Sequence, residues 1–368
     1  MPISTVPASR PCGAARVRAH PGRRFGAALL PLLLLAACDY PTASPKWYTE
    51  WLVPVKTTHL MPTQLLPATV SAVADGSAFQ VAVAPTTLAR SLGQLCSACG
   101  ALSGQNVPKP AFTATLVDTL DLPAGVSSTA LVGGTVSIAI TNGFSFDPLR
   151  PSATARGSLA FTLTSGTTTV GSLTISGSDT ALPAGTTIMR DVALSNGTVA
   201  GGLVATLTLS SPAGDVVRVD PSQSFGVTIT PQSIRVTSVA VVVSQKAVSV
   251  QEATLDLSDV DQALIDRVYG GTLVVAVDNP YTVTGPLSLT ITGGGLTSPI
   301  TKALNLTSGQ STQRIDFTLP EIKSMLGHAG LVVRATGTVS APAPVPVTPW
   351  QSVGITTELD LIVGPKES

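Results

Sequence analysis

The chain of 368 residues is poor in charged and aromatic side chains and has only three histidines. Asp, Glu, Lys and Arg together account for 11% of the residues, and Phe, Trp and Tyr for 4%. A Ser-His-Asp triad needs a histidine, and a structural zinc site needs about four Cys, His or acidic ligands. Beyond the N-terminal segment only His59 and His328 remain, so both kinds of site have few candidate residues.

The apolar run near the N-terminus is too short to span a bilayer. It extends from Phe25 to Ala37, about 13 residues, whereas a spanning helix needs about 20. Five arginines and no acidic residue precede it, at positions 10, 16, 18, 23 and 24. A basic segment, a short apolar run and small residues at a cleavage point form the layout of a signal peptide. We therefore expect residues 1–37 to be removed on export.

The end of this run, Leu35-Ala36-Ala37-Cys38, resembles the lipobox of bacterial lipoproteins. That family is cut before the cysteine and carries diacylglycerol on its sulfur, so the resemblance implies a membrane anchor at Cys38. Cleavage without lipid attachment remains the alternative, because small residues also suit an ordinary cleavage site. Asp39 resembles an inner-membrane retention signal of some proteobacterial lipoproteins. The choice between inner and outer membrane, and between periplasmic side and cell surface, stays open.

Without residues 1–37 the chain would keep 331 residues, of which 16 are basic and 21 acidic. A net charge of about −5 argues against nucleic acid as a partner and against a basic contact with anionic lipid. Thr, Ser, Val, Ala and Gly dominate the composition, and proline is frequent. Few charges together with many β-branched residues favour an all-β fold of sandwich or barrel type.

Cys96 and Cys99 form the only cysteine pair beyond residue 38. They lie in a Gly- and Ser-rich segment, and in an oxidising compartment a local disulfide is the simplest interpretation. Two alternatives stay open. A metal site would need more ligands than the two remaining histidines can add. A redox Cys-x-x-Cys motif is expected at a helix start among alternating strands and helices, and no such alternation surrounds this pair.

Four short blocks occur twice in the same order, about 130 residues apart, which indicates an internal duplication. Residues 119–122 (Thr-Leu-Asp-Leu) correspond to 254–257, and the stretch from Gly133 to Asn142 corresponds to Gly270–Asn279. Residues 202–204 correspond to 330–332, and residues 221–228 to 349–356. This spacing is far longer than the 20–50 residues of solenoid repeats, so each copy is a domain-sized unit.

Both copies are expected to be mainly strand, because apolar residues recur at every second position and turn residues follow at short intervals. The predicted fold is all-β, with two tandem related sandwiches of immunoglobulin or fibronectin type, an N-terminal β segment and a few short helices. The second copy is expected to contain helices at 262–268, with Ser258 as N-cap, and at 320–327.

The predicted division of the chain follows from these signals. It comprises a signal peptide (1–37), a tether (38–45), an N-terminal β segment (46–106) that packs on or completes the first sandwich, the first sandwich (107–231) and the second sandwich (238–364). The junction between the sandwiches is placed at Thr230-Pro231-Gln232-Ser233.

An aromatic cluster, Trp47, Tyr48 and Trp51, begins nine residues after Cys38. It either caps the core of the first sheet or lies at the level of the lipid headgroups, where Trp and Tyr are favoured. The sequence leaves both interpretations open.

One motif of the second copy is similar to a known family. The stretch Val277-Asp278-Asn279-Pro280-Tyr281 ends one strand, and a further strand follows after Pro286. This strand-Asn-Pro-strand pattern resembles the type 2 late-embryogenesis-abundant, or water-stress, β-sandwich domains. In the first copy Gly143 stands where that pattern has proline. Those domains have no catalytic residues, so the resemblance implies a binding or membrane-associated module, with lipid binding proposed for some members.

Sequence motifs of common catalytic sites are missing: there is no Gly-x-Ser-x-Gly elbow, no phosphate-binding loop and no His-Glu-x-x-His. Asp256, Asp259, Asp261 and Asp266 could suggest calcium, which takes oxygen ligands. Two of them, Asp259 and Asp261, fall in the first turn of an expected helix, where acidic residues offset the helix dipole. Neither a metal nor a cofactor is therefore expected.

The expected function is that of a non-enzymatic, membrane-anchored lipoprotein of the cell envelope that acts as a structural or interaction module. The alternative is a carrier of lipid or another apolar ligand. A third interpretation, an enzyme, would need a site that the sequence does not display. A carrier needs a continuous apolar cavity, whereas an interaction module has closed cores and an enzyme has converging polar groups.

Replacement of Cys38 by alanine tests the anchor. We expect the wild-type protein to carry diacylglycerol and to sediment with membranes, because two acyl chains anchor stably. The Cys38→Ala variant should lose both properties, as measured by intact-mass spectrometry and membrane fractionation. Cys12→Ala, the control, should retain both. A Cys38→Ala protein that still carries the lipid would contradict the lipobox interpretation.

Overall fold

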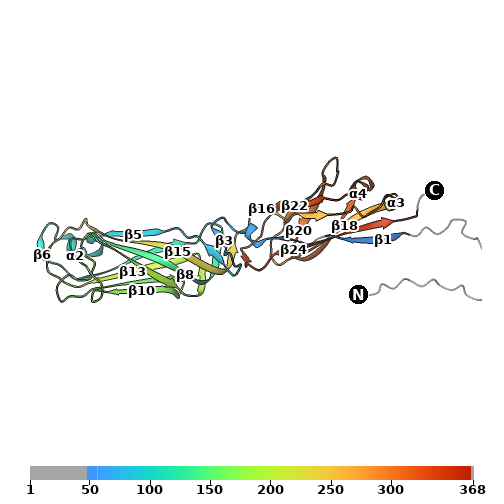
Figure 1. The fold of residues 1–368 in the computed structure, drawn as a ribbon. Coiled ribbons are helices and arrows are strands. Elements are labelled where there is room, and N and C mark those ends of the chain that lie inside the picture. Colours follow the sequence, from blue (N-terminus) through green and yellow to red (C-terminus); the bar gives the residue numbers. More distant parts are fainter. Residues whose placement is uncertain (1–47, 56, 366–368) are drawn as a thin grey trace, which may run out of the picture. The chain divides into compact units, whose positions relative to one another are not determined.

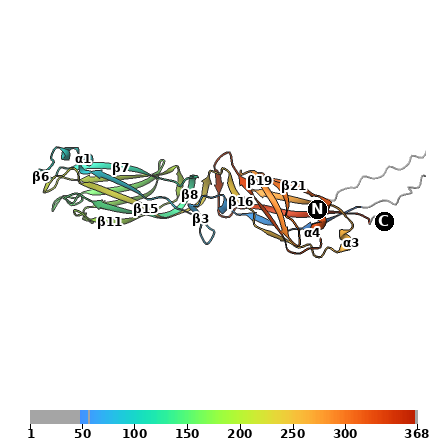
Figure 2. The same cartoon turned by 90° about the horizontal axis from the view of Figure 1, so that it is seen from above.

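The computed structural model describes residues 48–55 and 57–365. This part of the chain is mostly β-strand, arranged in several antiparallel sheets with a few short helices, as the composition predicted (Figure 1, Figure 2). The predicted signal peptide, Cys38 and the tether lie outside the described residues.

The described part of the chain begins with strands that pair with both copies, and the first copy follows. The strands up to the middle of the chain are β1 (Thr49–Pro54), β2 (Thr58–Leu60), β3 (Val70–Ala72), β4 (Phe79–Val81), β5 (Thr86–Ser91), β6 (Asn106–Pro108), β7 (Phe112–Asp121), β8 (Val126–Asn142), β9 (Ser158–Ser165), β10 (Thr168–Ser176), β11 (Thr187–Leu194), β12 (Gly197–Ala200), β13 (Gly202–Ser211), β14 (Val216–Arg218) and β15 (Ser224–Val241). The second copy contains β16 (Lys246–Ser249), β17 (Ala253–Leu255), β18 (Val268–Asn279), β19 (Gly285–Gly293), β20 (Ile300–Leu306), β21 (Gly309–Phe317), β22 (Leu331–Val339), β23 (Val345–Val347) and β24 (Val353–Val363). The helices are a 3-10 turn (Pro62–Gln64), α1 (Leu92–Leu95), α2 (Ser97–Gly100), α3 (Gln262–Ile265) and α4 (Leu319–Met325).

The two copies have the same strand order. In the first copy one sheet has the order β10-β9-β13-β7, and the other contains β11-β8-β15 with β5 paired to β15. In the second copy, sheet E has the order β20-β19-β22 with β16 and β17 paired to β22, and sheet A has the order β21-β18-β24 with β1 and β2 paired to β24. The shared order supports the duplication that the sequence indicates.

The predicted core positions of both copies are buried. In β8, Val136, Ile138 and Ile140 are fully buried, and in β18 Val275 and Val277 are nearly so. Side chains at every second position of a strand point to one face, so these residues face the partner sheet of their own copy. The period-2 pattern thus identified the buried faces correctly.

The N-terminal segment contributes strands to both copies. β1 and β2 pair with β24 and complete sheet A, whereas β5 pairs with β15. The prediction that residues 46–106 join the first sandwich alone is therefore wrong for β1 and β2. Alternation of apolar residues shows which face of a strand is buried, but it does not show which strand provides the hydrogen-bond partners.

The predicted junction at Thr230–Ser233 lies inside a strand. β15 continues from Ser224 to Val241, and its register against β8 shifts between Pro231 and Ser233. Proline has no N–H to give to the ladder, and a bulge beside it lets the strand continue. The proline that indicated a boundary in the sequence therefore marks an irregularity within the longest strand.

A buried asparagine ends the central strand β8 of the first copy. The side-chain nitrogen Nδ2 of Asn142 donates to the carbonyl oxygens of Phe146 and Leu182, each at 2.8 Å. Its Oδ1 accepts the N–H of Phe144 at 3.0 Å. The side chain is fully buried, so these three bonds satisfy backbone groups that water cannot reach.

The equivalent residue of the second copy, Asn279, makes the same three bonds. Its Nδ2 donates to the carbonyl oxygens of Val283 at 2.9 Å and Thr307 at 2.8 Å. Its Oδ1 accepts the N–H of Tyr281 at 3.0 Å. The asparagine, and not the proline that follows it only in the second copy, is therefore the structural element that both copies share.

Both expected helices of the second copy are present, but the first has a different N-cap. The Oδ1 atom of Asp261 accepts the N–H of Leu264 at the start of α3, whereas Ser258 belongs to the preceding turn. The prediction of Ser258 as N-cap is therefore wrong, because an aspartate closer to the apolar turn caps a helix equally well. α4 begins with a capping box between Thr318 and Glu321.

We predict that Asn142→Ala and Asn279→Ala each lower the free energy of unfolding by about 2–4 kcal/mol. Asn142→Ala leaves two buried carbonyls and one buried N–H without a partner, and Asn279→Ala leaves the buried Val283 carbonyl, the partly buried Thr307 carbonyl and the buried Tyr281 N–H. Unmade buried bonds are costly. Urea unfolding measures the change. Asn305→Ala is the control, because Asn305 is exposed and bonds Gln313 through its backbone; it should cost less than about 0.5 kcal/mol. Equal losses at all three positions would refute the role of the buried amide.

Candidate functional site

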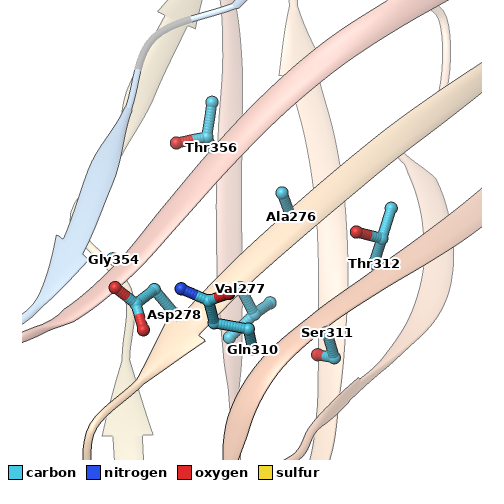
Figure 3. A pocket seen from close by; sticks show the side chains of 8 residues that line it. All are labelled: Ala276, Val277, Asp278, Gln310, Ser311, Thr312, Gly354 and Thr356. Carbon is cyan, nitrogen blue, oxygen red and sulfur yellow. The ribbon is translucent and has the colours of Figure 1, made fainter.

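The outer face of sheet A carries a hollow of about 480 Å³ (Figure 3). Small side chains leave this space open, because the neighbouring positions of three adjacent strands are occupied by alanine, glycine and threonine. The lining residues are Ala276, Val277, Asp278, Gln310, Ser311, Thr312, Gly354 and Thr356. β18 lies between β24 and β21, and β21 is the last strand of the sheet order, so the hollow lies beside an edge strand.

Polar groups gather at one end of this hollow. Asp278 and Gln310 are register partners on β18 and β21, and their side chains lie next to each other (Figure 3). The carboxylate accepts hydrogen bonds, whereas the amide both donates and accepts them. The hydroxyl groups of Thr312 and Thr356 flank the floor of the hollow. The arrangement suits a ligand that forms hydrogen bonds and has little bulk.

A much smaller cavity lies between sheets A and E. Its volume is about 20 Å³, and Val275 and Ile355 from sheet A and Leu289 and Val333 from sheet E are among its lining residues. One water molecule needs about 10–15 Å³, and ligand pockets occupy about 300–1,000 Å³. This part of the core is therefore too tightly packed to hold an acyl chain.

Three aspartates with lowered pKa values stabilise turns of the same type. Asp75, Asp220 and Asp256 each stand two residues before a serine, and Oδ1 accepts both the hydroxyl and the N–H of that serine. These bonds favour the charged carboxylate, the hydroxyl bond most strongly, and thereby lower the pKa of each aspartate. The perturbed carboxylates are therefore explained by local turns.

The acidic residues that suggested calcium do not assemble into a site. Asp256 bonds Ser258, Asp261 caps α3, and Asp266 accepts a bond from the Gln262 amide at 2.8 Å. Among residues 48–55 and 57–365, no group of three or more His, Cys, Asp and Glu side chains is placed to hold a metal ion.

Cys96 and Cys99 are joined by a disulfide bond. Cys96 also caps the short helix α2, and both cysteines are buried. A redox-active pair needs an accessible sulfur, and burial denies that access here. The bond closes the turn between α1 and α2 and lies against the apolar core of the first copy.

The two histidines of the described chain lie in different environments. His59 is half-buried in β2, with Nδ1 at 3.4 Å from the Ser352 hydroxyl. His328 is exposed in the loop after α4, where its carbonyl oxygen accepts the N–H of Leu257. Neither contact includes an aspartate, which a Ser-His-Asp triad requires to orient the histidine.

A buried lysine lies in the first copy and was not anticipated from the sequence. Lys109 is only 1% exposed, and its Nζ donates to the carbonyl oxygens of Pro110 at 2.9 Å and Pro212 at 2.5 Å. The ammonium group also lies 4.8 Å from the ring centre of Phe112 and 5.3 Å from that of Phe146. Desolvation of the charged form lowers the pKa of Lys109 to about 8.

The aromatic cluster near the start of the described chain does not cap a core. Tyr48 and Trp51 are about half exposed, and β1, which carries Trp51, belongs to sheet A of the second copy. This excludes the first of the two interpretations, in which the cluster covers the first sheet. Trp47 lies outside the described residues.

Within the described ranges, no helix combines the length and the apolar character needed to cross a bilayer.

We predict that the buried lysine makes stability depend on pH. The pKa of Lys109 is about 8 in the folded protein, against an ordinary lysine pKa of 10.5, so the unfolded state binds more protons between these two pH values. The free energy of unfolding should therefore rise by about 2 kcal/mol between pH 8 and 9.5. Urea unfolding at both pH values measures this rise. It should vanish in Lys109→Met and persist in Lys323→Met; a rise that persists in Lys109→Met would contradict the assignment.

No protein-family model matches the sequence, and no curated protein matches it. Among solved structures, the chain is similar to a protein of Parabacteroides distasonis ATCC 8503 described as a "putative secreted protein". The two sequences are 11% identical, and the match covers 87% of this chain and 100% of the other with a TM-score of 0.30. A likeness of this extent says nothing about the function of this chain.

Proposed function

We propose that this protein is an exported lipoprotein, anchored at Cys38, that acts without catalysis as an interaction module of the bacterial cell envelope. Its body consists of two tandem sandwiches of immunoglobulin or fibronectin type, an assignment supported by the strand order that the two copies share. The anchor is supported by the resemblance of Leu35–Cys38 to a lipobox and by the basic and apolar segments before it.

The proposal of a non-enzymatic protein is supported by the roles of the polar side chains. Asp75, Asp220 and Asp256 hold turns, and the Glu321 carboxylate bonds Lys302 at 2.7 Å while it caps α4. Catalytic groups instead converge on a point where substrate can bind. Each of these carboxylates has a local structural role.

The observation that carries the binding role is the hollow of sheet A beside β21, the last strand in the sheet order of the described residues. An extended segment of another envelope protein could pair with this edge and place small polar side chains in the hollow. Asp278 and Gln310 would bond that segment, and Thr312 would limit the size of its side chains. The partner proposed here is therefore a polar, extended protein segment.

The alternative, a lipid carrier, is less well supported. A carried acyl chain needs a continuous apolar cavity, and the cavity between sheets A and E measures about 20 Å³. Native mass spectrometry of the Cys38→Ala protein, purified without added lipid and then incubated with lipid extract, separates the two functions. An interaction module gives the mass of the chain alone, whereas a reproducible extra mass that dissociates as a phospholipid or fatty acid would establish the carrier.

We predict that filling the hollow weakens partner binding. A photo-reactive residue at position 310 should cross-link to a discrete partner in intact cells, and Thr312→Trp should reduce the yield about tenfold, which corresponds to 1.4 kcal/mol of binding free energy. Immunoblotting of the adducts measures the yield. Thr174→Trp, also an exposed threonine on a strand, is the matched control and should leave the adduct unchanged.

An equal loss in Thr312→Trp and Thr174→Trp would place the partner elsewhere. The same would follow from photo-adducts at position 310 that are unaffected by tryptophan at 312. Circular dichroism of both variants shows that the sheets are intact, because both positions face solvent and bulk can be added there without disturbing a core.

A further inference from the structure

At one end of sheet A, four large apolar side chains are exposed around the edge strand β1, Trp51 on one face and Leu52 and Ile362 on the other, with Tyr48 just before the strand. The exposed fractions of Trp51, Leu52, Ile362 and Tyr48 are 49%, 60%, 41% and 54%. We call this group the terminal patch. Single exposed apolar residues are ordinary, whereas a group at one place indicates a contact with a partner or with lipid.

Register brings these residues together. β1 pairs with β24 so that Leu52 lies opposite Asp360 and Glu50 lies opposite Ile362. Leu52 and Ile362 are therefore diagonal neighbours on the outer face of the sheet. Trp51 points to the other face, but β1 is the edge strand of the order, so its side chain also reaches solvent.

Aromatic rings extend the patch toward the start of the described chain. The ring of Tyr48 packs edge-on against Tyr269, with 5.5 Å between the ring centres. The hydroxyl of Tyr269 donates to the carbonyl of Pro365, and Nε of Arg267 donates to that of Gly364. Tyrosine and tryptophan rings with one apolar body and one polar tip are enriched at the headgroup level of bilayers.

The charges around the patch are of both signs, and they include the ion pair between Asp360, opposite Leu52, and Arg314. Glu50 lies on the same face of β1 as Leu52, and the exposed Arg267 lies beside Tyr269. Arginine can bond the phosphate groups of lipids, whereas the carboxylate favours a position in water. The patch therefore has the composition of a shallow interfacial contact and not of a buried protein core.

The patch lies close in sequence to Cys38, so a lipid at Cys38 would bring it near a bilayer. Tyr48 is ten residues after Cys38, and an extended chain of that length spans at most about 36 Å. A lipid on Cys38 would hold the patch within this distance of the bilayer surface. The exposed Trp350 precedes β24 at its other end, and this strand of 11 residues extends over about 36 Å.

We propose that the terminal patch lies against the headgroup region of the phospholipid bilayer and forms a second membrane contact beside the lipid anchor. This inference rests on the proposed lipidation of Cys38. A lipid anchor holds more firmly when a second contact adds to it. The contact orients the second copy with the start of β1 toward the membrane and the hollow of sheet A near the opposite end of β18.

Tryptophan quenching by brominated lipid tests the contact. Lipidated protein is reconstituted into vesicles of phosphatidylethanolamine and phosphatidylglycerol with brominated acyl chains. One variant keeps Trp51 alone (Trp47→Phe with Trp350→Phe), and the other keeps Trp350 alone (Trp47→Phe with Trp51→Phe). We expect brominated lipid to reduce the Trp51 emission about twofold and to leave Trp350 unchanged, because bromine quenches only at short range.

A second pair of variants checks that the patch itself causes the contact. Leu52→Thr with Ile362→Thr places β-branched threonine at both exposed strand positions, so the sheet should remain folded. It should abolish the quenching of Trp51. Val117→Thr, an equally exposed apolar residue on β7, should leave the quenching unchanged.

The outcomes separate the inference from the proposed function. Unquenched Trp51 in protein that mass spectrometry shows to be lipidated overturns the membrane contact and leaves the anchor intact. Protein without lipid on Cys38 refutes the anchor itself, and with it this inference. A blue shift of Trp51 that depends on protein concentration and not on lipid assigns the patch to a second copy of the chain, which also overturns the proposal.

Discussion

The antiparallel pairing of β1 with β24 is the contact that completes sheet A and fixes where the described chain enters it. It joins residues more than 300 positions apart in the sequence. For example, the Thr49 hydroxyl donates to the Val363 carbonyl oxygen at 3.4 Å, and these two residues are 314 positions apart. Within the described residues, β1 and β2 are the strands that pair with this side of β24. Contacts between such distant residues form slowly, since loop closure must precede them. The second copy can therefore be completed only after the whole chain is available.

The same pairing decides where functional surfaces lie. Because the chain enters through β1, any anchor that precedes Tyr48 leaves the protein at the end where β24 finishes. The hollow with Asp278 and Gln310 lies toward the other end of the same sheet, where β24 begins. In the proposed function, the two ends of this sheet would serve attachment and recognition separately.

The buried polar positions of the two copies tolerate fewer residue types than their apolar core positions do. Many combinations of Val, Ile and Leu fill a sheet core, because apolar packing tolerates exchange when volume is preserved. Asn142 and Asn279 are less replaceable, since each amide satisfies three specific backbone groups. Lys109 is a further case in which carbonyl oxygens and aromatic rings hold a cation away from water.

Composition and local pattern were sufficient to predict the all-β character, the duplication, the buried faces of β8 and β18 and the two helices of the second copy. These properties depend on neighbours in the chain and on the period of two that a strand imposes. The partner of β1, the continuation of β15 past Pro231, the hollow of sheet A and the burial of Lys109 depended on the tertiary structure alone. Hydrogen-bond partners and cavities arise between segments distant in sequence, and residue order contains no direct record of which strands will meet.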